Sequence, residues 1–372
     1  MDASDSVRVP AAAVESLVKG IMEGAGCEPN EAACIAGRLV GANLRGHDSH
    51  GVIRTPRYVE WVDIGRVVPG QTVVVEKEND VIAILDGGYG FGQSIGEQAI
   101  DIGVAKAKAN GVGITALRHS GHLGRIGDWA ERAAAQNCAS LHMVNVRGSL
   151  LVAPFGARER RGGTSPFCAG VPVGDSEPIV LDFATSLVAE GKALVAARGG
   201  KPLPDSALIN EAGVLTNDPV ALYGETPPGK SPDARQGLGA LAGFGLHKGS
   251  GLNFFMEMFA GALTGSGTNG ALGETERRRF CNGMLSVFMD VDFFHSDEWF
   301  ATEVRNFVAF WKSAALADGH EEVLVPGEVE RRTFSERTEN GLPLSRTAWD
   351  DILATAQRVG VSGRDLEAFA AY

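Results

Sequence analysis

The stretch Arg45-Gly46-His47-Asp48-Ser49-His50-Gly51-Val52-Ile53-Arg54 places two imidazoles, a hydroxyl, a carboxylate and two guanidiniums within ten residues. Such a density of polar and ionisable groups is typical of an active site. Reduction of a 2-oxo acid needs a proton donor near the carbonyl oxygen and a fixed cation for the carboxylate. His50 and Arg54 fit these roles, because imidazole titrates near neutral pH and guanidinium grips a carboxylate through two parallel hydrogen bonds.

The spacing of these polar residues predicts one wall of a pocket. If the chain is helical here, the four-residue offset puts His50 and Arg54 on one face, and Tyr58 continues that face. Ser49 could bind substrate through its hydroxyl or make a helix-end contact. Taken singly, His50 would more often satisfy helix-end carbonyls and Arg54 a surface ion pair, but the cluster and the motifs downstream favour the pocket.

The stretch resembles a motif, Asp-x-x-Ser-His-Gly-x-x-Arg with near variants, of the malate/L-lactate dehydrogenase family. Members of this family are NAD(P)-dependent 2-hydroxyacid oxidoreductases that do not use the Rossmann fold. Further segments are similar to elements of the same family, in order and rough spacing, over nearly the whole chain: Gly121-His122-Leu123-Gly124, Pro154-Phe155-Gly156, Gly163-Thr164-Ser165-Pro166, Asp182-Phe183-Ala184-Thr185-Ser186, Gly245-Leu246-His247-Lys248-Gly249-Ser250-Gly251-Leu252 and Pro326-Gly327-Glu328.

The resemblance implies roles for individual residues. His50 and His122 are the expected catalytic histidines, and the choice of principal acid/base between them stays open. The expected substrate-binding residues are Ser49, Arg54, Tyr58 and Ser149. The expected cofactor-binding residues are Asp182, Ala184, Thr185, Ser186, His247, Lys248, Gly327 and Glu328.

Three departures from the family pattern leave the substrate open. Ser165 stands where asparagine is usual, Ser250 replaces a common tyrosine, and Arg147-Gly148-Ser149-Leu150 departs from the usual Asn-x-Ser-Pro. Arg147 could be a second cation for a dicarboxylate or sulfonate, or could point outward to solvent. The outward orientation is favoured.

A glycine-rich segment, Gly88 to Gly96, follows a predicted strand and precedes a predicted helix, as a Rossmann phosphate loop does. Its spacing from Gly90 is Gly-x-Gly-x-x-x-Gly, and the next strand ends at Leu117-Arg118-His119 without an acidic residue for a ribose. We therefore expect these glycines to serve the turn and close helix packing. A Rossmann-type reductase remains one rival, and a non-catalytic metabolite-binding protein is another.

Apolar periodicity predicts helices and strands along the chain. The fold implied by the resemblance is α/β with a largely antiparallel central sheet. We expect residues 1–70 and 326–372 to form a helical module and residues 71–325 to form a sheet-containing region that binds cofactor and substrate. The expected helices are 10–23, 30–44, 93–110, 125–137, 249–263, 296–317 and 345–372; the expected strands are 72–77, 81–85, 113–117, 139–144, 179–182 and 284–291, with an ordered binding loop over 199–245.

Composition excludes several classes of protein. The 372 residues are 44% apolar, and the net charge is −12 without basic runs, which argues against nucleic-acid and anionic-membrane partners. Five cysteines without a Cys-x-x-Cys pair indicate reduced thiols in a cytoplasm. Residues 1–10 lack the apolar run of a signal peptide, and the apolar stretch 252–263 is too short to span a bilayer. His119 and His122 have no third metal ligand at a suitable spacing, so no metal is expected.

Together these features predict an enzyme that uses NAD or NADP to interconvert a small anionic 2-hydroxy acid and its 2-oxo form. Reduction of a cyclic 2-imino acid on the same scaffold is the alternative. Malate, lactate, sulfolactate, ureidoglycolate and sugar-derived keto acids all stay open as substrates. The resemblance also implies a homodimer.

Overall fold

The computed structural model describes residues 6–197, 202–225, 235–270, 279–361 and 369. Its largest sheet has seven strands in the order β2-β3-β4-β11-β5-β6-β7. Five of the six neighbouring pairs are antiparallel, and β3 and β4 run parallel. The predicted α/β fold with a largely antiparallel, non-Rossmann sheet is therefore confirmed. The strands are β2 (Val74–Glu78), β3 (Ile82–Asp86), β4 (Val112–Ser120), β11 (Cys281–Asp290), β5 (Cys138–Arg147), β6 (Phe167–Val173) and β7 (Ser176–Phe183).

Helices α4 (Gly92–Asn110) and α5 (Gly127–Ala134) pack on one face of this sheet, where alternate strand residues are apolar. Glycine allows the close approach. A Cβ on Gly96 would lie 2.5 Å from the Trp129 ring, and a Cβ on Gly92 would lie 2.2 Å from the carbonyl oxygen of His122. The interpretation of this glycine-rich segment as a packing feature is confirmed.

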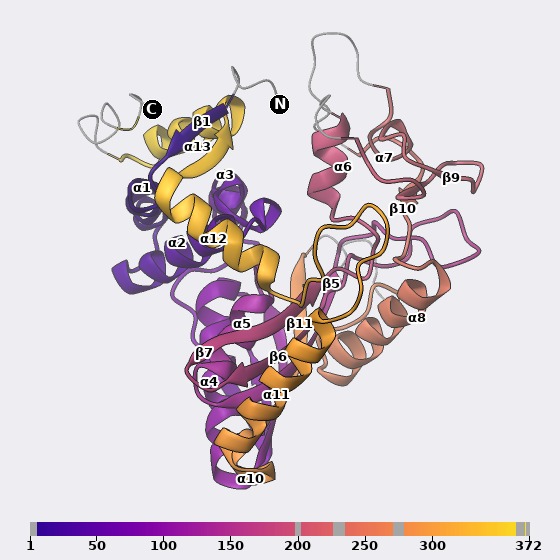
Figure 1. Ribbon diagram of the computed structural model, residues 1–372. Helices are drawn as coiled ribbons and strands as arrows, with labels where there is room; N and C mark the ends of the chain where they lie inside the picture. The colour runs from indigo at the N-terminus through magenta and orange to yellow at the C-terminus, as the bar shows by residue number, and fades with distance from the viewer. Residues whose placement is uncertain (1–5, 198–201, 226–234, 271–278, 362–368, 370–372) are drawn as a thin grey trace.

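Segments from both ends of the chain build a second core (Figure 1). β1 (Ser6–Val9) pairs antiparallel with β12 (Leu342–Ser345), so the two ends are joined by backbone hydrogen bonds. The amphipathic helices bury Trp349, Tyr58 and Leu17 between them. The helices of this module are α1 (Ala11–Gly24), α2 (Pro29–Leu44), α3 (Thr55–Asp63), α12 (Glu328–Asn340) and α13 (Arg346–Arg358).

A third, smaller core lies beside the other two and has its own three-stranded sheet, β10-β8-β9. Its elements are α6 (Glu190–Ala197), β8 (Leu208–Ile209), β9 (Leu215–Thr216), α7 (Val220–Tyr223) and β10 (Ala240–Leu241). The predicted loop over 199–245 is therefore in part a packed subdomain; residues 198–201 and 226–234 lie outside the described residues.

The remaining helices lie outside these cores. The π-helix η4 (Glu257–Leu263) continues α8 (His247–Met256) and contacts β5 and β11. The long helix α11 (Asp297–Lys312) follows α10 (Val291–Phe294) and runs along β6 (Figure 1).

Most predicted helices and strands are confirmed within a few residues of their bounds. Of the helix expected over 345–372, α13 covers residues 346–358, and residues 362–368 and 370–372 lie outside the described residues. β6, β12 and α12 were not predicted. The condition for a shared helical face of His50, Arg54 and Tyr58 is not met, because the chain makes two 3-10 turns, Asp48–His50 and Val52–Arg54, and α3 begins only at Thr55. The five cysteines form no disulfides. No helix in the described ranges has the length and apolarity needed to cross a bilayer.

Candidate active site

One edge of the large sheet, formed by the ends of β4, β5 and β7 and the start of β11, carries several of the predicted site residues. His122 lies just after the end of β4, Arg147 is the last residue of β5, and Asp182 is the second-last residue of β7. β11 runs antiparallel to β4 and β5, so its first residue, Cys281, pairs with Arg147 at the same edge. The two 3-10 turns of the helical module reach this edge, as the contacts of His50 show below.

A network around Asn43 fixes the shape of the two 3-10 turns. The Asn43 amide donates to Asp48 (2.6 Å) and accepts from the backbone N–H of Val52 (2.7 Å). Arg337 of α12 forms two further hydrogen bonds with the Asp48 carboxylate, at 2.5 and 3.1 Å. A Cβ on Gly51 would lie 2.0 Å from Asn43 Oδ1. Glycine is therefore required between the two turns, and the turns are held from both chain ends.

The two predicted catalytic histidines lie together. Their ring centroids are 5.4 Å apart and the ring planes differ by 11°. Ser49 Oγ is 3.1 Å from His50 Nδ1, and Tyr58 Oη is 2.7 Å from His122 Nδ1. Tyr58 is itself fully buried, so its hydroxyl contacts the site through His122. Four of the predicted residues thus form one polar cluster.

Arg54 completes this cluster. Its Nε donates to the carbonyl oxygen of Ser49 at 2.6 Å, which directs the guanidinium back over the first turn. Within the described part of the chain, no carboxylate lies within ion-pair distance of this guanidinium. Burial and the nearby Arg54 charge lower the pKa of His50 to about 3 and hold the pKa of His122 well below its usual range. The cluster therefore contains two neutral imidazoles and one uncompensated cation.

Asp182 lies at the end of β7, where it contacts the start of α5. Its carboxylate accepts from the backbone N–H of Gly127 at 2.7 Å. Burial raises its pKa, while the positive charges of His47 and Arg125 act in the opposite direction. Asp182 is therefore a desolvated carboxylate beside the first 3-10 turn.

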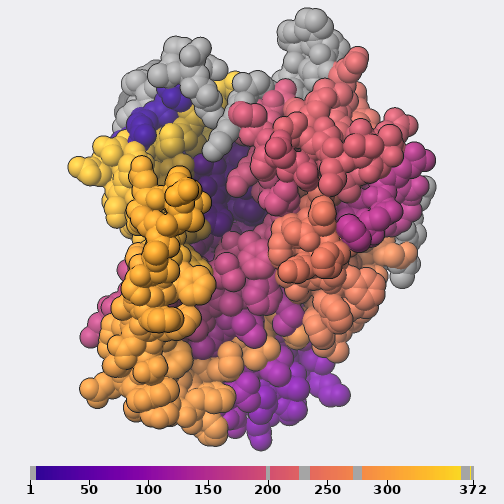
Figure 2. Space-filling model, turned by 45° about the vertical axis from the view of Figure 1, so that its right-hand side comes forward, coloured from indigo at the N-terminus to yellow at the C-terminus, as the bar shows by residue number. Residues whose placement is uncertain are grey.

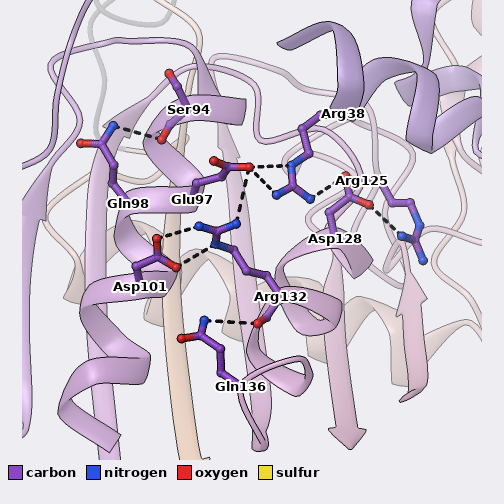
Figure 3. Close-up of polar contacts among 9 residues, drawn as sticks. All are labelled: Arg38, Ser94, Glu97, Gln98, Asp101, Arg125, Asp128, Arg132 and Gln136. Atoms are coloured by element: carbon purple, nitrogen blue, oxygen red, sulfur yellow. Dashed lines mark hydrogen bonds and ion pairs between the residues drawn. The ribbon is translucent and has the colours of Figure 1, made fainter. Parts of the chain in front are cut away.

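A buried ionic network supports this side of the site (Figure 3). Arg125 lies between Asp128 (2.7 Å) and Glu131 (2.8 Å) and is almost completely buried. Arg38 of α2 bonds Glu97 of α4 at 2.5 Å. The network thus ties the helical module to the helices of the sheet region.

The hydroxyls of the Asp182–Ser186 segment are already used within the protein. Thr185 donates to the carbonyls of Thr164 and Ser165 and accepts from Asn253. Ser186 donates to the carbonyl of Val188. Ala184, which has no side-chain polar group, is partly exposed between them. These hydroxyls therefore shape the strand end and are not available to a ligand in this structure.

The first turn of α8 lies against this strand end. A Cβ on Gly249 would lie 2.4 Å from the carbonyl oxygen of Phe244 and 2.8 Å from that of Thr185. His247 and Lys248 are exposed at the start of the helix, where the backbone dipole is positive. Lys248 has no acidic partner among the residues that the structure describes. This turn has the charge and the exposed groups needed to hold a phosphate.

Gly327 and Glu328 begin α12 against β7. Gly327 has φ +88°, and a Cβ there would lie 3.5 Å from the backbone nitrogen of Val180. The Glu328 carboxylate accepts from Lys312 (2.5 Å) and from the backbone N–H of Val325 (3.0 Å). Its side chain therefore ties the start of α12 to the preceding loop and to the end of α11.

The departures from the family pattern have structural explanations in two cases. Ser250 accepts from the backbone N–H of Phe155 at 2.8 Å, so its hydroxyl holds a neighbouring loop. The expectation that Arg147 points outward is wrong: its side chain turns inward, donates to the carbonyl of Ser266 at 3.2 Å, and has a buried Nε without a partner. The Ser165 hydroxyl is buried without a partner. Ser149 lies near the same edge, and its backbone N–H bonds Val146.

Sequence reasoning missed Gln93, Asn43 and Phe280. Gln93 donates to Tyr58 at 2.9 Å, and the Phe280 ring lies 6.3 Å from that of His122 and 5.0 Å from Trp61. Gln93 and Phe280 lie far from the 45–54 stretch in the sequence and carry no motif. The glycine-rich segment before Gln93 was the one available signal, and it was assigned to packing alone.

The site lies in a hollow between parts of the molecule. Figure 2 shows this hollow between the yellow C-terminal helices and the pink 202–245 region, with indigo N-terminal residues at its floor. Helix α6 forms one wall beside the site, because a Cβ on Gly191 of α6 would lie 2.8 Å from Cβ of Ser49. A small ligand in the hollow would meet the polar cluster.

Comparison with known proteins finds relatives that match nearly the whole chain. The family model described as malate/L-lactate dehydrogenase matches residues 9–353. Hydroxycarboxylate dehydrogenase B of Escherichia coli K12 is 36% identical over 364 residues, which cover 97% of each chain.

Solved structures show the same fold. Sulfolactate dehydrogenase from Methanocaldococcus jannaschii superposes with a TM-score of 0.84 at 27% identity, covering 98% of this chain and 100% of the other. A Δ1-piperideine-2-carboxylate reductase from Pseudomonas syringae pvar. tomato gives a TM-score of 0.77 at 27% identity, covering 94% and 99%.

Proposed function

The chain belongs to the malate/L-lactate dehydrogenase family, and on that premise we propose that it is an NAD(P)-dependent oxidoreductase that interconverts a small 2-hydroxy acid and its 2-oxo form. The relatives named above act on hydroxycarboxylates and sulfolactate, which share a carboxylate beside a hydroxyl-bearing carbon.

The observation that carries this proposal is the environment of Arg54. A guanidinium without a carboxylate partner, next to two neutral imidazoles, is costly unless an anion binds there. The carboxylate of a 2-oxo acid supplies that anion and matches the two-pronged donor geometry of arginine. The adjacent carbonyl oxygen then comes within reach of the stacked histidines.

Arg54, His50 and His122 have separate roles in the reduction. Arg54 clamps the substrate carboxylate, which offsets the Arg54 charge that lowers the pKa of His50. In the oxidation direction neutral His50 accepts the proton of the substrate hydroxyl, and in the reduction direction the His50 imidazolium, protonated from solvent, returns a proton to the carbonyl oxygen. His122 positions the same oxygen. When bound, the reduced nicotinamide supplies the hydride to the carbonyl carbon.

The residues present fit NAD or NADP. Lys248 and His247 at the positive end of α8 would hold a phosphate, and the backbone of Ala184 and the Asp182 carboxylate would line the neighbouring wall. The absence of a side chain at Gly249 lets this turn pack directly against the end of β7, which brings Lys248 close to the Asp182–Ser186 segment. Gly327 and Glu328 would contact the nucleotide from α12.

A panel assay tests the proposal. The full-length protein is mixed with NADH or NADPH and with pyruvate, oxaloacetate, 3-sulfopyruvate and Δ1-piperideine-2-carboxylate, and absorbance at 340 nm is followed. We expect oxidation with at least one 2-oxo acid and a preference for one nucleotide. Turnover of the cyclic imine alone would favour the imino acid reductase, as in the Pseudomonas neighbour. No oxidation with any of these would favour a metabolite-binding protein that kept the scaffold.

We also propose that the protein is a homodimer in the cytoplasm. Two surface patches expose large apolar side chains that a monomer would leave in water. The α8–η4 patch comprises Phe254, Phe255, Phe259 and Leu263, and the α11 patch comprises Trp299, Phe307, Phe310 and Trp311. The five free cysteines support a reducing compartment.

A further inference from the structure

A chain of hydrogen bonds runs from the start of α4 to the active-site histidine. Gln93 lies in the first turn of α4 and is 1% exposed. Its Nε2 is 2.9 Å from Tyr58 Oη, and Tyr58 Oη is 2.7 Å from His122 Nδ1. The rings of Phe91 and Trp61, each 5.7 Å from the Tyr58 ring, hold the tyrosine between these two partners. The chain is therefore rigid.

The direction of these hydrogen bonds follows from the chemistry of the groups. An amide NH₂ can only donate, so the Tyr58 oxygen accepts from Gln93. The single hydroxyl proton of Tyr58 is then free to be donated to His122 Nδ1. A neutral imidazole that accepts at Nδ1 carries its proton on Nε2.

The amide orientation of Gln93 is favoured energetically. Gln93 Oε1 is buried without a partner. Rotating the amide by half a turn would put the NH₂ group into that position and leave two N–H groups unpaired. Buried unpaired N–H groups are rarer than unpaired carbonyls, so the orientation that donates to Tyr58 is the less costly one.

We propose that Gln93 is a positioning residue which, through Tyr58, holds His122 in the tautomer that presents Nε2–H to the substrate's carbonyl oxygen. The kinetic part of this inference rests on the proposed function, whereas the tautomer itself does not. No described residue hydrogen-bonds His122 Nε2, so this nitrogen is available to a ligand. A neutral imidazole that donates there stabilises negative charge on the oxygen without giving up a proton.

With this tautomer, the two histidines have different roles, and His50 is the principal acid/base. His122 already accepts at Nδ1 and donates at Nε2, and burial beside Arg54 keeps its pKa low. It acts as a fixed hydrogen-bond donor. Proton exchange falls to His50, whose Nδ1 contacts the hydroxyl of Ser49, a group able to donate or accept.

Nitrogen-15 NMR of histidine-labelled full-length protein tests the tautomer directly, with the His122 signals assigned by their loss in His122→Asn. In the wild type we expect an unprotonated Nδ1 and a protonated Nε2 for His122 at pH 7.5. Spectra of Gln93→Glu are recorded from pH 7.5 to 9.5, because burial raises the pKa of a carboxyl at this position. Once ionised, this side chain can only accept, so Tyr58 should turn its proton toward residue 93 and His122 should become protonated at Nδ1. Tyr58→Phe removes the fixed donor and should give a mixture of tautomers.

Gln98→Glu is the matched control, because Gln98 lies on the same helix but accepts from the backbone N–H of Val73. It should keep the wild-type tautomer. A wild-type His122 protonated at Nδ1, or Gln93→Glu protein that keeps Nε2–H, would overturn the proposal. If Gln93→Glu does not fold, the wild-type and Tyr58→Phe spectra still decide it.

Kinetics then separate this inference from the proposed function. With an active 2-oxo acid, Gln93→Glu should lower kcat by roughly 10²-fold, the usual cost of losing one oxyanion donor, and leave KM nearly unchanged. A reversed tautomer with unchanged kcat would refute the role of Nε2–H in the reaction. An inactive wild type with the predicted tautomers would refute the proposed function alone.

Discussion

Arg54 has no carboxylate partner among the described residues. Arg125, Arg38 and Arg337 are all paired with acidic side chains. A cation that is left uncompensated beside buried imidazoles lowers their pKa and holds them neutral. The same charge is therefore available to a substrate anion, and two predictions at single residues depend on it.

Arg54→Lys should raise KM for the 2-oxo acid by roughly 10- to 100-fold, because one ammonium cannot reproduce a two-pronged hydrogen bond. Initial rates over a range of 2-oxo acid concentrations measure this change, and fluorescence titration with NADH should show unchanged cofactor affinity. Arg57→Lys is the control, since Arg57 is exposed and pairs with Glu60 at 3.0 Å. An unaltered KM in Arg54→Lys would count against the clamp.

His50→Ala should lower kcat by roughly 10²- to 10⁴-fold, the range expected for loss of a general acid/base. Cofactor affinity should change little, because His50 lies at the 3-10 turn rather than at α8. Steady-state kinetics and NADH titration of the same preparation separate the two effects. Wild-type turnover in this variant would remove His50 from the mechanism.

The sequence predicts elements well where side chains repeat regularly and poorly where neighbours dictate the structure. α1, α2 and α4 were predictable because each buries an apolar stripe. α12 buries none of its residues, and β6 contains Gly170 and Pro172, so neither has a clear pattern of its own.

The site residues, too, were predictable where the sequence carries a motif and not where neighbouring side chains dictate the structure. His50, Arg54 and His122 were predictable because they stand in motifs. The condition for a shared helical face is not met, because Gly51 is extended and Asn43 fixes the turns from outside. Gln93 had no signal beyond the glycine-rich segment before it, since a buried glutamine acquires its role only from the two side chains that the fold brings to it. The division of the chain into modules at residues 70 and 326 stays a prediction.

At the scale of elements, the ionic network between α2, α4 and α5 supports the site from behind (Figure 3). Arg125→Leu should lower the free energy of unfolding by about 3–5 kcal/mol, because Asp128 and Glu131 would lose a buried partner. Arg358→Leu, which breaks an exposed pair with Asp63, should cost at most about 1 kcal/mol. Urea denaturation followed by tryptophan fluorescence compares them, and equal losses would show that the network adds no stability.

The whole molecule should lose stability in mild acid. Burial lowers the pKa of His142 to about 3, and this residue sits between Ser140 and Ser286 inside the sheet. Since its folded pKa is below the unfolded value of about 6.5, the unfolded state binds more protons as the pH falls. The free energy of unfolding is therefore not reduced by this histidine well above pH 6.5, and it falls progressively as the pH drops from 6.5 toward 3.

Between pH 7.5 and 5.0 this single histidine should contribute a loss of about 2 kcal/mol in the free energy of unfolding. His142→Gln should be less stable than the wild type at pH 7.5 but should lose about 2 kcal/mol less over that interval. Urea denaturation at both pH values measures the difference. Parallel losses in the two proteins would show that His142 is not the titrating group.

Assembly is the last property of the whole molecule that the surface predicts. Phe310 is 73% exposed and Phe255 is 52% exposed, and both lie in patches of neighbouring aromatic side chains. Transfer of such rings from water into an interface is worth roughly 1.5–3 kcal/mol each, so a second copy of the chain is an effective cover. Phe310→Lys and Phe255→Lys should each shift the sedimentation coefficient from dimer toward monomer at micromolar concentration, because a charge would be buried in the interface. Val214→Lys, at a 58% exposed position outside both patches, should sediment as the wild type does. A wild type that sediments as a monomer would refute the homodimer, and an unshifted Phe310→Lys dimer would place its interface elsewhere.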